Sequence, residues 1–171
     1  QGSNLTSKVT NANKSDVYKV TARSRYDVIN HIKQIVNAKH STNMTIGILS
    51  LSNYSLKALY DELGNVNVRT FYCQNNQDIR NYDFDSHIPV LITPFSAKGM
   101  EFDCVILVGY NGLLHTGDFQ SIWKEIVYVS LTRTSNELYL IEESDTIKEI
   151  SRLSEWATLS LNGNNKGTFD F

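Results

Sequence analysis

Hydrophobic residues along this chain gather in short apolar runs that are separated by segments with helical spacing. The runs predict strands at Val17–Val20, Ile46–Ser50, Val66–Tyr72, Pro89–Thr93, Cys104–Gly109 and Glu137–Glu142. Most of these runs lack a strict alternation of apolar and polar residues, which is typical of strands buried on both faces of a parallel sheet. We therefore expect a mainly parallel sheet, with a polar loop at Gln74–Ser86.

Helical spacing marks the segments between these strands. Ser24 and Asp27 form a capping pair that opens the first helix, and Gly64 is placed to end the second. The predicted helices run from Ser24 to about Ala38, from Ser52 or Asn53 to Gly64, from Phe119 to Thr132 and from Thr146 to Trp156. Helices that alternate with strands along the chain indicate an α/β fold in which helices cover both faces of the sheet.

Length and composition favour a single domain. The chain has 171 residues and 41% hydrophobic content, which is enough to bury a substantial core. We expect residues 1–16 to be a tag remnant and polar lead-in, residues 17–158 to form the domain, and residues 159–171 to be a flexible tail. The fragment is expected to be monomeric.

Charge and the remaining residue types narrow the classes of function. Lys and Arg number 16 against 18 Asp and Glu, a net charge of −2, which argues against strong autonomous binding of nucleic acid. Cys73 and Cys104 lie in apolar runs and are interpreted as core thiols, and the scattered histidines lack the spacing of metal ligands. No apolar stretch approaches the length of a membrane span, and we expect a cytoplasmic protein that binds no metal itself.

The first segment that can carry chemistry is the connection Thr93–Asp103, between two apolar strands. It combines hydroxyl groups, Lys98, Gly99 and two carboxylates. Gly99 permits a backbone conformation that a side chain would block, and Lys98 supplies a charge suited to phosphate. Because a glycine turn with flanking charges is common between strands, a purely structural role is the alternative.

The second segment, Tyr128–Thr134, lies at the end of an apolar helix. Its Arg133 can either bind an anionic ligand or offset the negative end of the helix dipole. In an open parallel sheet, ligands collect beyond the carboxyl ends of the strands. We expect both segments to lie there.

Together and in this order, the two segments resemble motifs V and VI of the UvrD/Rep-type superfamily 1 helicases, which lie in the second RecA-like domain of those proteins. Motif V is usually written T-x-H-x-x-K-G-L-E-F-D, and it is matched here by Thr93, Ser96, Lys98, Gly99, Met100, Glu101, Phe102 and Asp103. Motif VI is usually Y-V-A-x-T-R-A, and it is matched by Tyr128, Val129, Thr132 and Arg133. Met100 replaces a leucine, and the departures suit a divergent branch close to the helicase IV and HelD-like group.

The resemblance implies a RecA-like fold of the P-loop NTPase type and a share in an ATP site. Arg133 would be the arginine finger, a planar cation that stabilises charge on the γ-phosphoryl group in the transition state. In related phosphoryl transfer such a finger contributes about 10³ to 10⁵ in rate. Lys98, Gly99, Glu101 and Thr132 would line the nucleotide.

The resemblance also places Thr93, Phe95 and Ser96 nearer a single strand of nucleic acid. Phe95 stands where the family usually has a histidine, so it is either a ring on which a base stacks or a core phenylalanine. The segment Ile46–Asn53 sits where motif IV belongs, but Leu51 occupies the place of its usual arginine. Leu51 cannot make the cationic contact to phosphate that this arginine would add to the contact of Arg133.

An absence in the sequence limits what the chain does alone. It contains no Gly-Lys dipeptide, so the phosphate loop G-x-x-x-x-G-K-[ST] is missing. ATP and Mg²⁺ are therefore expected to be bound mainly by an N-terminal RecA-like domain in cis, and the fragment is expected to be inactive alone.

The sequence thus predicts the C-terminal motor-domain fragment of an ATP-dependent DNA helicase or translocase, with part of the surface for single-stranded DNA. RNA is the less favoured track. One alternative is a pseudo-helicase or regulatory protein-interaction module, for example an RNA-polymerase-associated HelD-like protein. Another is a free-standing flavodoxin-like binding domain, which would bind phosphate or flavin by itself.

Overall fold

The computed structural model describes residues 7–10, 16–40, 42–109 and 122–144, which form one sheet with helices packed against it. The strands are β1 (Ser7–Thr10), β2 (Asp16–Ala22), β3 (Ile46–Ser50), β4 (Phe71–Tyr72), β5 (Val90–Ile92), β6 (Phe102–Val108) and β7 (Thr134–Glu143). The helices are α1 (Arg25–His40), α2 (Asn53–Asn65), α3 (Asn76–Asn81) and α4 (Ile122–Leu131), with a 3-10 turn, η1, at Phe84–Ser86.

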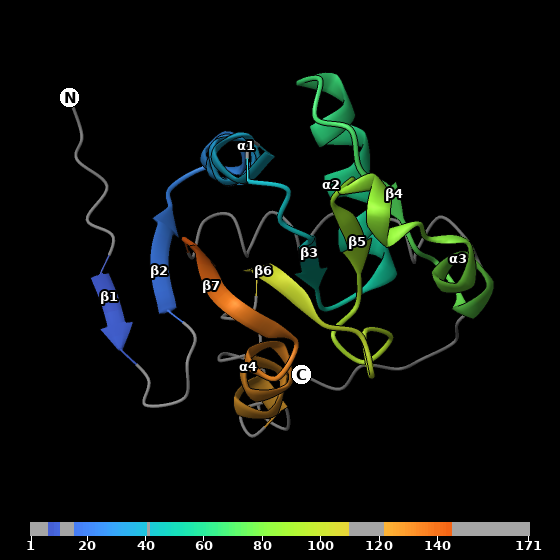
Figure 1. The fold of residues 1–171 in the computed structure, drawn as a ribbon. Coiled ribbons are helices and arrows are strands. Elements are labelled where there is room, and N and C mark those ends of the chain that lie inside the picture. The colour runs from blue at the N-terminus through green and yellow to red at the C-terminus, as the bar shows by residue number, and fades with distance from the viewer. Residues whose placement is uncertain (1–6, 11–15, 41, 110–121, 145–171) are drawn as a thin grey trace, which may run out of the picture.

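The sheet has the strand order β1-β2-β7-β6-β3-β5-β4. β1 is antiparallel to β2, and every other pair of neighbouring strands in this order is parallel. Figure 1 shows α1 and α2 on one side of the sheet and α4 on the other. The predicted α/β fold, a mainly parallel sheet with helices on both faces, is confirmed.

Two apolar layers occupy the two faces of the sheet. Beneath α1 and α2, Ile32 and Leu59 pack with Ile48 and Ile106 of the strands. On the opposite face, Ile126 of α4 belongs to a second buried cluster formed with side chains of β3, β5, β6 and β7. Every residue of β3 is buried, which agrees with the apolar run Ile46–Leu49 in the sequence, and the polar Ser50 at its end is buried as well.

Side-chain caps fix the starts of the first two helices. The Ser24 hydroxyl accepts a hydrogen bond from the Asp27 amide at 3.1 Å, and the Asp27 carboxylate accepts one from the Arg23 amide at 2.9 Å. The Ser52 hydroxyl accepts from the Ser55 amide at 3.1 Å and caps α2. These contacts confirm the predicted capping pair and helix starts, because each satisfies amides that have no partner within the helix.

The predicted end of α2 at Gly64 is wrong. The helix continues to Asn65, and Asn67 takes the left-handed conformation, with φ of 60°. Asparagine tolerates this conformation, so it can end a helix in place of glycine. The Val68 amide then donates to the Leu63 carbonyl at 2.9 Å, which leaves only Phe71–Tyr72 of the predicted strand Val66–Tyr72 paired in the sheet.

The segment Gln74–Ser86 is not the loop that its polarity predicts. It contains α3, opened by a reciprocal capping box between Asn75 and Asp78, and η1. The buried Tyr82 ring packs 5.4 Å from the Phe71 ring and anchors the segment to the sheet. A polar sequence does not reveal such a helix, because the ring of Tyr82 and the cap at Asn75 are enough to hold it in place.

Part of the predicted polar lead-in also belongs to the sheet. Ser7–Thr10 form β1, and Asp16 is the first residue of β2. The predicted helix Thr146–Trp156 and the predicted tail at residues 159–171 lie outside the described residues. Within the described ranges, no helix is both long enough and apolar enough to cross a membrane.

Gly47 offers a test of the core packing. A Cβ atom at this position would lie 2.8 Å from Cδ2 of the buried Phe102 ring, which has no room to move away. We expect Gly47→Ala to lower the free energy of unfolding by about 1–3 kcal/mol, the usual cost of overpacking a core. Urea unfolding followed by circular dichroism measures the change.

Gly64→Ala is the matched control. A Cβ atom at Gly64 would meet no heavy atom within 4 Å, and the residue lies inside α2. This variant should be neutral or stabilised by up to about 1 kcal/mol. Equal unfolding free energies for the two variants would contradict the packing described for Gly47.

Candidate functional site

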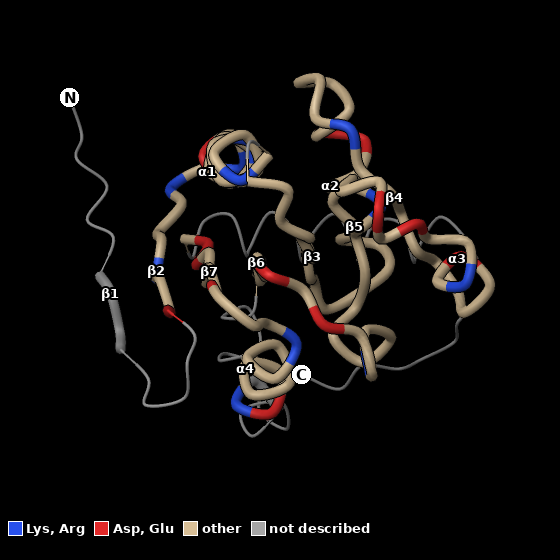
Figure 2. The backbone as a smooth tube through the Cα atoms, in the orientation of Figure 1, with Lys and Arg blue, Asp and Glu red and all other residues tan. Residues whose placement is uncertain are grey.

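The two segments that resemble helicase motifs meet at the amino ends of β6 and β7. The Phe102 amide donates to the Arg133 carbonyl at 2.7 Å, and Phe102 pairs with Thr134 in the sheet. Glu101 directly precedes Phe102, and Arg133 directly precedes Thr134, so the pairing of Phe102 with Thr134 brings Glu101 and Arg133 close together. Figure 2 shows the corresponding basic segment between α4 and β7 beside an acidic segment at the start of β6.

This location corrects the expectation that both segments lie beyond the carboxyl ends of the strands. The connection from Thr93 begins at the carboxyl end of β5, but it returns across one face of the sheet to the amino end of β6. Arg133 lies at the amino end of β7, since a helix that leads directly into a strand must end where that strand begins. One connection thus touches both edges of the sheet.

Hydrogen bonds hold the first part of this connection in a series of turns. The Thr93 hydroxyl accepts from the Ser96 amide at 3.2 Å, and the Thr93 carbonyl accepts from the Ala97 amide at 3.0 Å. Ala97 is fully buried and anchors the turns to the core. Phe95, between these contacts, is 61% exposed, so the alternative that it is a core phenylalanine is wrong.

The second part of the connection depends on Gly99. Its φ is +88°, a conformation that L side chains rarely adopt, and a Cβ atom there would meet nothing within 4 Å. Backbone conformation, rather than lack of space, therefore accounts for the glycine. Lys98, Gly99 and Glu101 are exposed, so all three are accessible to a ligand.

Arg133 has one polar atom that the domain leaves unsatisfied. Its Nε is buried and has no hydrogen-bond partner among the described residues. Its amide donates to the Ser130 carbonyl at 3.1 Å, while the neighbouring Thr132 hydroxyl donates to the Val129 carbonyl at 2.7 Å. The backbone at the end of α4 is thus fixed, and part of the guanidinium group lacks the acceptor that buried donors normally have.

Asp103, the last residue of the motif V resemblance, has a structural position. Its Oδ2 accepts from the Thr45 amide at 2.8 Å and from the Thr45 hydroxyl at 2.9 Å. Its Oδ1 accepts from Ser135 and Asn136, each at 3.4 Å, where two residues of β7 bulge opposite Asp103. The carboxylate thereby ties β6 to the chain before β3 and to the bulge next to Arg133.

An ion-pair cluster at the carboxyl ends of the strands, opposite the edge that carries Arg133, was not predicted from the sequence. Arg25 donates from Nε to Glu62 at 2.7 Å and from a terminal nitrogen to Glu143 at 3.2 Å. Glu143 ends β7 and is only 9% exposed, so a carboxylate lies at a carboxyl end of the sheet. Nothing local signals this cluster, because its members come from α1, α2 and β7.

The cysteines are core residues, as predicted. Both are free and buried. Burial raises the pKa of the Cys73 thiol to about 11 and that of Cys104 to about 12, with smaller contributions from nearby carboxylates. In the part of the chain that the structure describes, no three His, Cys, Asp or Glu side chains gather in a way that could hold a metal ion.

Comparisons with known proteins agree with this architecture. The fold is similar to that of the C-terminal domain of a possible DNA helicase from Lactobacillus plantarum WCFS1, with 19% sequence identity, a TM-score of 0.59, and coverage of 78% of this chain and 74% of that one. The Pyrococcus furiosus Hef helicase domain gives 14% identity, a TM-score of 0.46, and coverage of 75% of this chain and 27% of that one, which is too low to support an argument. No family model and no curated protein matches the chain. The predicted α/β fold, a mainly parallel sheet with helices on both faces, is thus shared with the Lactobacillus plantarum domain.

The structural position of Asp103 can be tested by Asp103→Asn. The amide keeps the size of the side chain but loses charge and acceptor capacity toward Thr45, so the free energy of unfolding should fall by about 1–3 kcal/mol. Asp85→Asn, at an exposed position, should change it by less than about 0.5 kcal/mol. Chemical denaturation at constant salt compares the two, and equal values would contradict the described bonding of Asp103.

Proposed function

We propose that this chain is the second RecA-like domain of an ATP-driven nucleic-acid motor, and that it completes an ATP site by supplying Arg133. The observation that carries the proposal is that the buried Nε of Arg133 has no acceptor among the described residues. Hydrogen bonds fix Arg133 at the end of α4, next to the start of β6, which follows Glu101. The Arg133 side chain as a whole is only partly buried, so an anionic ligand can reach its guanidinium group and accept charge-assisted hydrogen bonds there. Phosphate oxygens suit its planar donors.

The ATP that Arg133 contacts would be bound mainly by a separate domain. This chain has no phosphate loop, and the Glu143 carboxylate lies at a carboxyl edge of the sheet, where phosphate groups bind in many open parallel sheets. A phosphate there would meet a buried negative charge. In the proposed complex, Glu101 contacts the nucleotide ribose, and Lys98, Gly99 and Thr132 lie near the phosphates, with Mg²⁺ bound by the partner domain.

The single strand would bind at the other end of the same connection. Thr93, Phe95 and Ser96 lie beyond the carboxyl end of β5, whereas Arg133 lies at the amino end of β7. The connection between them is held by consecutive turns, so a shift at Arg133 on domain closure can move the residues at the strand-binding end. The track that we expect is DNA.

Similarity in fold to the C-terminal domain of a possible DNA helicase supports this proposal, because that domain has the same architecture over most of both chains. The order of the two motif-like segments is a second and independent support. A free-standing flavodoxin-like domain would not need an arginine with an unsatisfied buried nitrogen at the amino edge of its sheet.

A regulatory protein-interaction module is the second candidate, and one observation favours it. Leu51, where the motif IV resemblance would place an arginine, packs against the apolar cluster beneath α4. A domain that had lost motor activity could keep its fold for contact with a protein such as RNA polymerase. In that case, the full-length protein would have no ATPase activity.

Arg133 variants of the full-length protein test the motor proposal. We expect Arg133→Ala to lower ATP turnover stimulated by single-stranded DNA by about 100-fold or more, because the transition-state charge loses its donor. Arg133→Lys should recover little, since an ammonium group lacks the planar pair of donors. Steady-state phosphate release with saturating oligonucleotide measures both variants.

Arg80→Ala is the matched control, since Arg80 is an exposed arginine on α3. It should leave turnover within about twofold of the unaltered protein. Turnover near the unaltered value in Arg133→Ala would rule out the finger. Absence of turnover in the unaltered full-length protein would favour the regulatory module.

A further inference from the structure

Ion pairs join both ends of α1 to β7. Lys39, in the last turn of α1, donates to the two carboxylate oxygens of Glu137 at 2.8 and 2.6 Å. Arg25, the first residue of α1, donates to Glu143 at 3.2 Å. Glu137 lies near the start of β7, whereas Glu143 ends that strand. The pair formed by Lys39 therefore belongs to the same edge of the sheet as Arg133.

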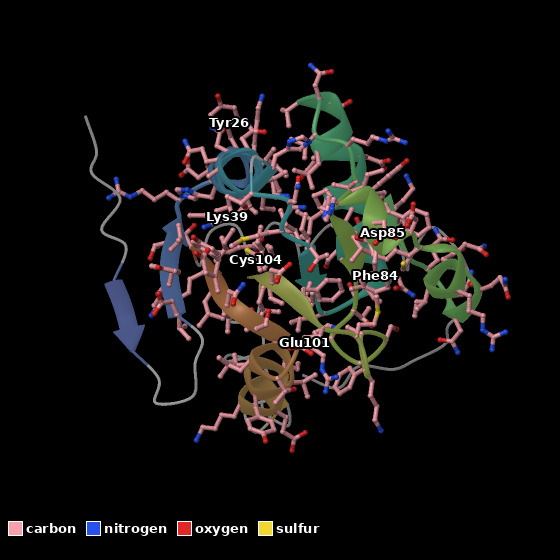
Figure 3. All side chains as sticks on the ribbon, in the orientation of Figure 1. Tyr26, Lys39, Phe84, Asp85, Glu101 and Cys104 are labelled. Atoms are coloured by element: carbon pink, nitrogen blue, oxygen red, sulfur yellow. The ribbon has the colours of Figure 1, made fainter. Side chains whose placement is uncertain are left out.

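The ion pair between Lys39 and Glu137 is largely shielded from water. The exposed fractions of the two side chains are 17% and 19%, and Figure 3 shows Lys39 beneath α1, near the buried Cys104. The Tyr139 hydroxyl donates to Glu137 Oε2 at 3.0 Å. Burial, together with the negative charge of Glu137, raises the pKa of this hydroxyl, so it stays protonated as a donor. Loss of Lys39 would leave the carboxylate without its cation in a poorly solvated place.

Glu137 also closes the bulge of β7 that follows Arg133. Its carbonyl accepts from the hydroxyl of Thr134, the residue directly after Arg133, at 2.8 Å. Regular pairing of β7 with β6 resumes at Glu137, beyond the two bulged residues. Because a bulge disrupts the strand pairing locally, the position of Arg133 depends on how firmly the far end of the bulge is held. Contacts thus run from Lys39 through Glu137 and Thr134 to the backbone of Arg133.

A shielded ion pair is better suited to fixing geometry than to adding stability. The cost of desolvating both charges offsets much of their attraction, so apolar side chains in their place can give a domain of equal stability. The hydrogen bonds of the pair, in contrast, set the distance and the direction of both groups. Placement matters at a nucleotide site, since a displacement of about 1 Å can cost about 100-fold in rate.

We propose that Lys39 and Glu137 are positioning residues, which hold the bulge of β7 so that the Arg133 guanidinium group meets the γ-phosphoryl group of ATP in the transition state. This inference rests on the proposed function and adds two residues that lie outside both motif-like segments. Both act through the backbone around Arg133, without contacting the nucleotide. Their loss should lower kcat and leave the KM for ATP nearly unchanged, because the weakened interaction is one made in the transition state.

ATP turnover by the full-length protein, with saturating single-stranded DNA, tests the inference. We expect Lys39→Met to lower kcat about 10-fold and to change the KM for ATP by less than about twofold. Lys39→Arg should recover kcat to within about threefold of the unaltered protein, since a guanidinium group can also donate to both carboxylate oxygens. Circular dichroism at the assay temperature shows whether each variant is folded.

Glu137→Gln gives a second and milder test, which also serves if Lys39→Met does not fold. The amide keeps the size of the side chain but loses its charge and one acceptor oxygen. We expect kcat to fall about threefold or more, again with little change in the KM for ATP.

Arg133→Ala separates positioning from a general loss of stability. If Lys39 acts through Arg133, Lys39→Met should change kcat by less than about twofold once Arg133 is replaced by alanine, because both changes then remove the same interaction. Release of radiolabelled phosphate measures this residual turnover.

Arg25→Met is the matched control, because Arg25 forms the corresponding pair between α1 and β7 at the carboxyl edge, with Glu143 only 9% exposed. Its kcat should stay within about twofold of the unaltered value, since the pair is distant from Arg133. The inference is overturned if Lys39→Met and Glu137→Gln keep a normal kcat. It is also overturned if Lys39→Met has its full effect in the Arg133→Ala protein, or if Arg25→Met lowers kcat as much.

The same measurements separate this inference from the proposed function. A large loss of turnover in Arg133→Ala, with a normal kcat in Lys39→Met, removes the positioning role and leaves the arginine finger standing. Normal turnover in Arg133→Ala, or none in the unaltered protein, removes both.

Discussion

The pairing of β6 with β7 at their amino ends determines where the chemistry of this domain lies. The hydrogen bond from the Phe102 amide to the Arg133 carbonyl joins the end of one motif-like segment to the end of the other. Asp103 and the β7 bulge hold that pairing from the side, through Thr45 and through Ser135 and Asn136. Without this register, Glu101 and Arg133 would have no defined relation, and the proposed nucleotide-facing surface would not exist.

The same connection carries a second consequence, because it starts at the carboxyl end of β5 and finishes at the amino end of β6. The proposed nucleotide contacts and the proposed strand contacts therefore lie at opposite edges of one sheet. They are linked through turns anchored by the buried Ala97. A short and firmly held connection transmits small displacements more directly than a flexible loop would.

Much of the fold could be predicted from the sequence, because local signals and tertiary packing agree. The apolar runs of β3 and β6 and the caps at Ser24 and Ser52 are local features. The caps and β3 formed where they were expected, and β6 overlaps its predicted range but begins two residues earlier, at Phe102. One prediction failed where a distant contact decided the outcome, because Tyr82 packs on Phe71 and holds α3. Another failed between two local signals, because Asn67 rather than Gly64 takes the left-handed conformation that ends α2. The pairing of Ser7–Thr10 with β2 likewise has no local signal.

By itself, the sequence determined the α/β class, the missing phosphate loop and the identity of the residues in the two motif-like segments. These follow from spacing and residue type, which need no knowledge of distant contacts. The tertiary structure alone decided that Arg133 lies at an amino edge with an unsatisfied Nε, that Arg25 and Glu143 occupy a carboxyl edge, and that Phe95 is exposed. The reason is physical: strand order and register bring together residues that are far apart in the chain, and no local pattern encodes that order.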